Sequence, residues 1–277
     1  MKAIFQFYSI PLIFCFLFPN QLTSQPVGKE KSLHDEVSEI FQNASGVDKH
    51  LKIDVKALAD GVKKSILESN KISKKLSNVL NPNTAGKLTM KEKRELLDAM
   101  KQIYEIYKNI DDNRDQFTKL LLKYDENLDL QSQKIQNLIN TYKQQLKTLE
   151  EQNLELSKKK PDISKREKQD LEFTEINIPI NKAKIEKLEM VELLIDQIRR
   201  DYTKTNEEIM LFFNAVKNGT LTSKNLIEYF EFDIELEKIL QSIDSVKNLN
   251  DLTKGIQDSL QNISESIRNL GKATDNL

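Results

Sequence analysis

Turn-forming and reactive residues are scarce in this 277-residue chain, which has seven glycines, six prolines, one cysteine and no tryptophan. Because tight turns and phosphate-binding loops depend on glycine, the composition disfavours turn-rich β folds and nucleotide-binding loops. Charged residues make up 31% of the chain, and lysine, a good helix former, far outnumbers arginine. The composition therefore predicts an all-α protein.

Net charge is also nearly absent, since 42 basic residues stand against 43 acidic residues and leave a net charge of −1. Proteins that bind nucleic acid or anionic lipid usually carry an excess of positive charge that attracts phosphate groups. We therefore expect no nucleic-acid partner.

The first 24 residues have the features of a secretory signal peptide. Lys2 supplies a positive charge, residues 10–18 form an apolar core, and Pro19 follows it. We expect cleavage at or close to Ser24, and the alternative is an uncleaved anchor. No later segment approaches the roughly 20 apolar residues of a membrane span. We therefore expect no stable membrane span after cleavage of the signal.

The single cysteine, Cys15, lies within this segment. Phe14 precedes it, whereas a lipoprotein signal needs a small residue there, so lipidation is disfavoured. The mature chain would have no cysteine and therefore no disulfide. Small secreted eukaryotic domains commonly depend on disulfides, so their absence favours a bacterial protein. We therefore expect export to a bacterial periplasm, to the cell surface or to the extracellular medium.

The strongest pattern in the chain is a stripe of eighteen positions from Leu96 to Leu156, separated by alternating steps of four and three residues. Fourteen of these positions are apolar, which is typical of a long helix that packs on a neighbour. Thr89 and Glu92 have the spacing of a capping box. The pattern predicts one helix over about 89–157, roughly 100 Å long at 1.5 Å per residue.

Four positions of this stripe are polar: Arg114, Gln131, Gln145 and Gln152. Arg114 lies in the segment "DDNRD" at 111–115, the weakest helical patch of the stripe. Two alternatives remain open there. The helix bends or breaks near 111–115, or it is straight and Arg114 extends to solvent.

Other stripes and turn signals divide the rest of the chain. Before the long helix we predict a flexible segment at 25–48 with a short helix at 33–43, and then a helix at 49–80. After it we predict a short helix at 164–173, which a second capping box (Ser164 and Glu167) opens, and an extended connector at 175–181. A helix at 181–217 stopped by Gly219, a last helix from Thr222 to about 270 and a disordered tail at 271–277 complete the predicted order.

Short connections favour antiparallel neighbours. The 49–80 helix is expected to fold back on the first half of the long helix, and the 181–217 helix on its second half. The predicted fold class is therefore an all-α, elongated antiparallel helical bundle or coiled coil. A hairpin lobe at 49–120 and a bundle lobe at 121–270 would share the central helix at about 89–157.

Catalytic, nucleotide-binding and metal-binding motifs are not recognisable in the sequence. The only histidines are His34 and His50, and a metal site that combines them with Glu36 is disfavoured against solvated residues near the N-terminus. We therefore expect no enzyme activity, no cofactor and no metal.

Five aromatic residues flank Gly219, and two interpretations of them remain open. In the first, an exposed aromatic patch binds a partner protein, and the candidate residues are Phe213, Tyr229, Phe230 and Phe232. In the second, Phe212 and these four residues form a small core that closes the end of a helical hairpin.

Charge is unevenly distributed along the chain. Residues 48–80 have eight lysines against four acids, and residues 226–245 have six acids against one lysine. The two faces could meet within one molecule, could join two copies head to tail, or could be unrelated.

These observations favour a non-catalytic structural or scaffold protein that mediates protein–protein assembly in the bacterial envelope or an appendage. The alternative is a secreted or periplasmic binding module that holds a client or host protein, as a holding chaperone does. A helical pore-forming toxin is a third hypothesis, and "MLFFNAV" at 210–216 is a poor candidate for its membrane segment.

Overall fold

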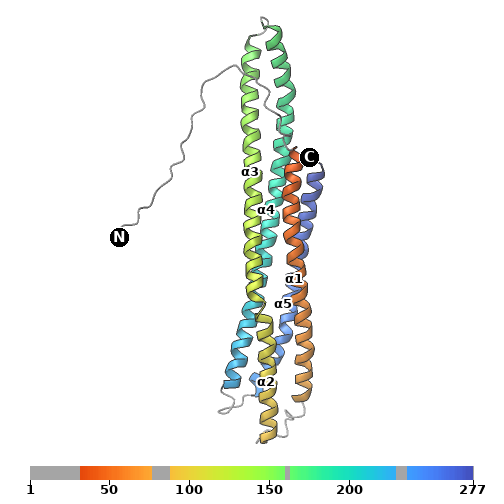
Figure 1. The fold of residues 1–277 in the computed structure, drawn as a ribbon, viewed down its shortest axis with the longest axis vertical. Coiled ribbons are helices and arrows are strands. Elements are labelled where there is room, and N and C mark those ends of the chain that lie inside the picture. Colours follow the sequence, from red (N-terminus) through yellow and green to blue (C-terminus); the bar gives the residue numbers. More distant parts are fainter. Residues whose placement is uncertain (1–31, 77–87, 160–162, 229–235, 277) are drawn as a thin grey trace, which may run out of the picture.

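The computed structural model describes residues 32–76, 88–159, 163–228 and 236–276. Five α-helices fill these ranges, and no strand occurs within them (Figure 1). The helices are α1 (Leu33–Leu76), α2 (Met90–Asp111), α3 (Arg114–Lys158), α4 (Lys165–Glu228) and α5 (Leu236–Asp275). The predicted all-α, elongated helical bundle is confirmed.

The helices form a long shaft. α2 and α3 follow one another along one side, and α4 packs against both of them and against α5 (Figure 1). α1 packs mainly against α5 and only lightly against α2 and α3. The predicted contact of the 49–80 helix with the first half of the long helix is present but minor, and the main partner of this helix is α5. An apolar stripe shows that a helix needs a neighbour, but it does not show which helix that neighbour is.

One hydrophobic core runs through the shaft, and it contains buried residues from all five helices. Its largest fully buried side chains include Tyr107, Tyr124 and Phe212. This core joins residues of the predicted hairpin lobe at 49–120 to residues of the predicted bundle lobe at 121–270. The described helices of both predicted segments therefore contribute to one shared core.

The predicted central helix breaks within the weak patch at 111–115, as one of the two alternatives required. Asp112 and Asn113 separate α2 from α3. Both residues keep nearly helical dihedrals, with φ −58° and ψ −21° at Asp112 and φ −85° and ψ −9° at Asn113. Arg114 lies at the start of α3, and its Nε is 3.6 Å from Asp111 Oδ1.

Both predicted capping boxes are present. The N–H of Glu92 donates to Thr89 Oγ1 over 3.3 Å, and the N–H of Thr89 donates to Glu92 Oε2 over 2.6 Å. The second box repeats this arrangement, because Glu167 N–H donates to Ser164 Oγ over 3.3 Å and Ser164 N–H donates to Glu167 Oε2 over 2.9 Å. Hydrogen bonds from Ser164 lower the pKa of Glu167 to about 2. The two boxes fix where α2 and α4 begin.

Two predicted helix ends are absent because the helices continue. α1 runs through Asn43 and Gly46 without a break, so the separate short helix at 33–43 was wrong. Ala44 and Asp48 are both buried there, and this packing outweighs the weak helix propensity of the segment. α5 likewise extends to Asp275, beyond the start of the predicted disordered tail at 271–277.

The prediction also failed over α4, which is 64 residues long and contains Pro179 and Gly219. The extended connector at 175–181, the helix start at 181, the stop at Gly219 and the new start at Thr222 are all wrong. Pro179 removes one backbone hydrogen bond. Leu171 and Ile185, on either side of it, are buried and hold both parts of the helix against α3.

Candidate interaction surface

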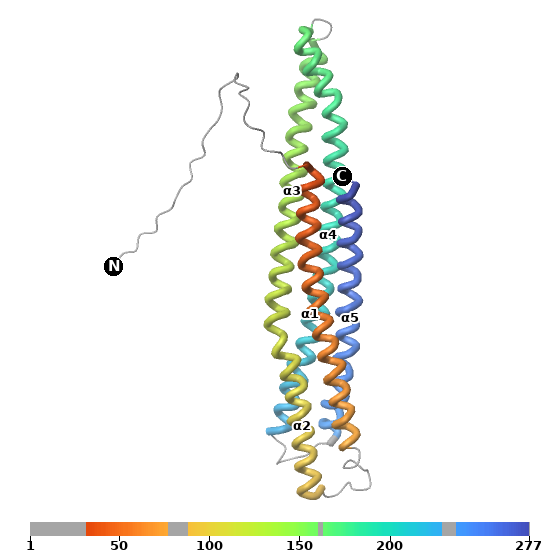
Figure 2. Tube along the Cα trace, turned by 45° about the vertical axis from the view of Figure 1, so that its right-hand side comes forward, coloured from red at the N-terminus to blue at the C-terminus, as the bar shows by residue number. Residues whose placement is uncertain are grey.

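A two-helix arm extends beyond the shaft. It consists of residues 142–158 of α3 and 165–186 of α4, and it continues past the first residue of α1 and the last residue of α5 (Figures 1 and 2). The end of α5 marks its base, because Lys187 Nζ donates to the carbonyl oxygen of Asn276 over 2.7 Å. The 22 residues of α4 in the arm extend about 33 Å.

The inner seam of the arm holds its two helices together. On α4 the buried residues are Leu171, Thr174, Asn181 and Ile185. On α3 the half-buried residues are Tyr142, Leu146, Leu149, Asn153 and Leu156. The predicted stripe placed Gln145 and Gln152 in this seam, but both are exposed and the residues that follow them face α4 instead. The register of the predicted stripe is therefore off by one residue at these two positions.

Polar contacts in the inner seam and along its edges fix the register of the arm. Asn153 Nδ2 donates to Thr174 Oγ1 over 2.9 Å. Lys182 Nζ lies 2.9 Å from Glu150 Oε1, and Lys143 Nζ lies 2.8 Å from Glu189 Oε1. Ion pairs as exposed as these contribute about 0–1 kcal/mol each. Their main effect is to specify which turns of α3 and α4 lie side by side.

The opposite face of α4 carries an outer stripe of exposed apolar residues, which we define as Phe173, Ile176 and Ile180. Their exposed fractions are 59%, 62% and 45%. The steps of three and four residues place them on one helix face, away from the inner seam. Large apolar side chains in succession on a free helix face are typical of an interaction surface.

The sequence contained this signal, but Pro179 obscured it. Ile176, Ile178 and Ile180 alternate with Asn177 and Pro179, and this two-residue spacing is why the sequence predicts an extended connector at 175–181. In the helix that actually forms, Ile176 and Ile180 face solvent and Ile178 is half-buried. A helical period, with steps of three and four residues, places Phe173, Ile176 and Ile180 in one stripe.

The predicted aromatic site is only partly described. Phe213 is 4% exposed, and its ring centroid lies 5.6 Å from that of Phe117 and 5.2 Å from that of Phe212. Phe213 therefore belongs to the core, and its proposed exposure to a partner was wrong. Tyr229, Phe230 and Phe232 lie outside the described residues.

The other sequence candidates do not come together. His34 and His50 are sixteen residues apart on α1, which separates them by about 24 Å along the helix axis. Across the described ranges, no group of three or more histidine, cysteine, aspartate or glutamate side chains is arranged to hold a metal ion.

The basic and acidic segments lie beside one another within one molecule, at least over their described parts. Ser69 Oγ of α1 donates to the carbonyl oxygen of Ile243 of α5 over 3.1 Å in a buried contact. This contact places α1 beside α5, but the described acids Glu228 and Asp244 pair with Lys224 and Lys247 of their own helices.

A polar layer crosses the core of the shaft. The Tyr124 and Tyr202 rings are 4.6 Å apart, and the Tyr202 hydroxyl donates to the carbonyl oxygen of Leu121. Asp201 Oδ2 accepts from Ser266 Oγ over 2.7 Å. Burial raises the pKa of Tyr124, so its hydroxyl stays protonated at any physiological pH. The layer links α3, α4 and α5 by side-chain contacts in the core.

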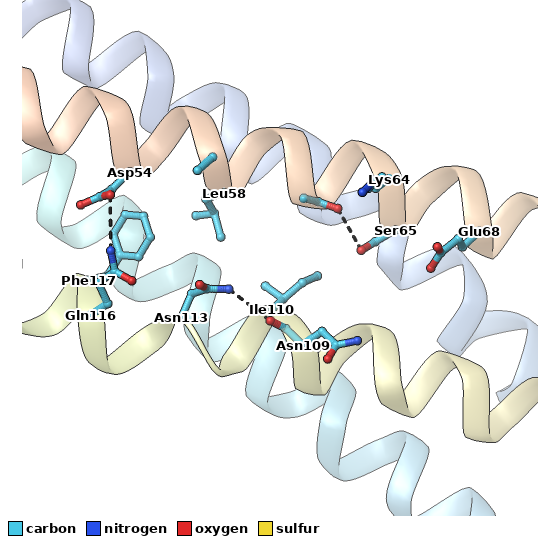
Figure 3. Close-up of a pocket in the computed structure, with 12 residues that line it drawn as sticks. Asp54, Leu58, Lys64, Ser65, Glu68, Asn109, Ile110, Asn113, Gln116 and Phe117 are labelled. Atoms are coloured by element: carbon cyan, nitrogen blue, oxygen red, sulfur yellow. Dashed lines mark hydrogen bonds between the residues drawn. The ribbon is translucent and has the colours of Figure 1, made fainter.

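A hollow of about 330 Å³ lies between α1 and the junction of α2 and α3 (Figure 3). On the α1 side, the small residues Ala57, Gly61 and Ser65 leave this space unfilled. Gln116 Nε2 donates to Asp54 Oδ1 over 3.4 Å across the hollow. The side chains of Gln116 and Asp54 bond to one another and do not point together into the hollow. The hollow is a consequence of the light packing of α1 on α2 and α3.

Among the helices described here, none combines the length and the apolar character that crossing a membrane requires. Comparisons of the chain with protein families, with curated proteins and with solved structures found no match.

Proposed function

We propose that this chain is a non-catalytic, exported helical protein that mediates protein–protein assembly in the bacterial envelope or an appendage, and that its arm contacts the partner. The observation that carries the proposal is the outer stripe, in which Phe173 and Ile176 are each more than half exposed on a helix that projects from the shaft. The arm is fixed to the shaft, since α3 and α4 each run from the shaft into the arm as one uninterrupted helix.

A binding module that holds a client or host protein is the second candidate, and the same stripe favours it. The two roles differ in the partner, because a holding chaperone accepts many non-native chains whereas an assembly protein accepts one folded surface. The narrow stripe of three residues favours the assembly role, since promiscuous binders use broader and more adaptable apolar surfaces.

Photo-crosslinking tests whether the arm contacts a partner. A benzoyl-phenylalanine placed at Ile176 is expected to yield adducts of higher mass in bacterial cells that export the chain. Leu67 of α1 is the matched control, because it is also 62% exposed but lies on the shaft. We expect at least about tenfold more adduct at position 176, since anchors of a binding surface are buried on association. Equal adduct at both positions would contradict the assignment of the arm.

Export is tested separately from binding. We expect the chain isolated from an exporting bacterium to begin at or near Gln25, because the cleavage site follows a small residue after the apolar core. Intact-mass measurement of the purified chain identifies the cleavage position. A chain that keeps Lys2 and its apolar core would support the uncleaved anchor and contradict release from the membrane.

A further inference from the structure

The outward face of α1 is rich in lysine. Steps of three and four residues, with Lys64 next to Lys63, keep its members on the side of the helix opposite the buried stripe. We define the lysine face as the exposed residues Lys49, Ile53, Lys56, Asp60, Lys63, Lys64, Leu67, Lys71 and Lys74. It extends over about 38 Å of helix. α1 runs along the outside of the shaft over this length (Figure 2).

Positive charge on the lysine face is largely uncompensated. The face has six lysines and one acid, Asp60, whose Oδ1 lies 4.0 Å from Lys63 Nζ. Asp54 and Glu68 lie to one side, at the hollow between α1 and the junction of α2 and α3. Within the described chain, no ion pair involves Lys49, Lys56, Lys64 or Lys71. The face therefore presents a local excess of positive charge.

The net charge of −1 does not cancel this local excess. At physiological ionic strength the Debye length is about 8 Å, which is shorter than the diameter of one helix, about 10 Å. Acids on the far side of the shaft are therefore screened from a partner that touches α1. The balance of charge over the whole chain disfavours an anionic partner in general, but it does not exclude one at the lysine face.

The residue types of the face indicate the class of partner. Lysine is its only basic residue, and it has neither arginine nor an aromatic ring. Nucleic-acid sites use arginine forks and stacking aromatic rings, and protein interfaces are enriched in both but depleted in lysine. Lysines interspersed with exposed aliphatic residues are instead suited to the surface of an anionic bilayer.

The aliphatic residues of the face are Ile53 and Leu67, which are 56% and 62% exposed. They are fourteen residues apart, so they lie on the same side of α1 and about 21 Å from one another along its axis. Lysines precede and follow each of them along the face. When the lysines contact lipid phosphates, both aliphatic side chains can therefore enter the headgroup layer.

We infer that the lysine face binds the surface of an anionic phospholipid bilayer, with the shaft parallel to the membrane and Ile53 and Leu67 inserted among the headgroups. This role is separate from the proposed function, because the lysine face lies on the shaft and the outer stripe lies on the arm. A lipid contact adds no protein mass at Leu67, so this position remains a control for protein partners in photo-crosslinking.

Co-sedimentation with lipid vesicles tests the inference. Residues 25–277 are used, because they contain every described helix and lack the apolar core at 10–18, which would itself bind lipid. We expect vesicles of phosphatidylglycerol and phosphatidylcholine, in about a 1:2 ratio, to bind at least about tenfold more tightly than phosphatidylcholine alone. Binding should weaken as salt is added. Equal binding to both vesicles, or binding to neither, would overturn the inference.

A variant with four lysines replaced tests the face itself. The changes are Lys49→Gln, Lys56→Gln, Lys64→Gln and Lys71→Gln. Together they are expected to weaken binding to the anionic vesicles at least about a hundredfold, since each lysine close to the surface contributes roughly fivefold. Circular dichroism is expected to show an unchanged fold, because all four side chains are exposed.

The matched control makes the same change in net charge on α4. It replaces four exposed lysines that form no ion pair within the described chain, by the changes Lys165→Gln, Lys168→Gln, Lys204→Gln and Lys217→Gln. We expect this control to weaken binding less than about fivefold, because charges distant from the contact are screened. Equal losses in the two variants would show that the lysine face has no special role and overturn the inference.

The aliphatic residues distinguish a bilayer from other polyanions. Ile53→Gln combined with Leu67→Gln is expected to weaken vesicle binding at least about fivefold, since apolar insertion adds to the electrostatic attraction. Double-stranded DNA and polyglutamate, which represent nucleic acids and acidic proteins, are expected to bind at least about tenfold more weakly than the anionic vesicles at equal ionic strength. Equally tight binding of either polymer, or unchanged vesicle binding by the double variant, would overturn the inference.

Discussion

Gly219→Ala is expected to lower the free energy of unfolding by about 2 kcal/mol, because an added methyl group overpacks the core. A Cβ at position 219 would lie 2.3 Å from both Cε1 and Cζ of Tyr107. The Tyr107 ring cannot move away freely, since it is 1% exposed and its hydroxyl lies 2.7 Å from Ser245 Oγ. Denaturant unfolding measured by circular dichroism gives the change.

Gly46→Ala is the matched control, since position 46 also lies within a helix but has no atom within 4 Å of an added Cβ. There we expect the opposite sign, a gain of up to about 1 kcal/mol, because alanine has the higher helix propensity. If Gly219→Ala stabilised the protein as much as Gly46→Ala, α4 and α2 could not approach as closely as the structure shows.

Gly219 also explains why the sequence misplaced a helix end. Asn218 and Gly219 form a common stop signal, and a local interpretation ends the helix there. In the structure the glycine serves close packing of α4 against the Tyr107 ring, which lies more than a hundred residues earlier in the chain. A contact between distant segments cannot be recognised from the residues next to the glycine.

The helical class and the two capping boxes could be predicted from the sequence, because both depend on residues that lie within a few turns of one another. The break at 111–115 was one of two alternatives that the sequence left open, because polar residues cluster there. The pairing of α1 with α5 could not be predicted, because every amphipathic helix offers a similar stripe. The outer stripe was missed because one proline, Pro179, suggested extended chain where packing on both sides maintains a helix.

Gln131→Leu is expected to raise the free energy of unfolding by about 2 kcal/mol, because it removes buried polar atoms without hydrogen bonds. Gln131 is 1% exposed, and within the described part of the chain neither its Nε2 nor its Oε1 has a hydrogen-bond partner. Leu128 and Ile135, one turn away on either side, are buried, so the site already favours an apolar side chain.

Gln145→Leu is the control that separates burial from sequence pattern. Both glutamines occupy positions of the same predicted stripe, but Gln145 is exposed in the arm. Its substitution is expected to change stability by less than about 0.5 kcal/mol. The midpoint of denaturant unfolding should therefore rise for Gln131→Leu alone, with an unchanged slope. A neutral or destabilising Gln131→Leu would show that the amide has a partner, such as a buried water, whose hydrogen bonds compensate for its burial.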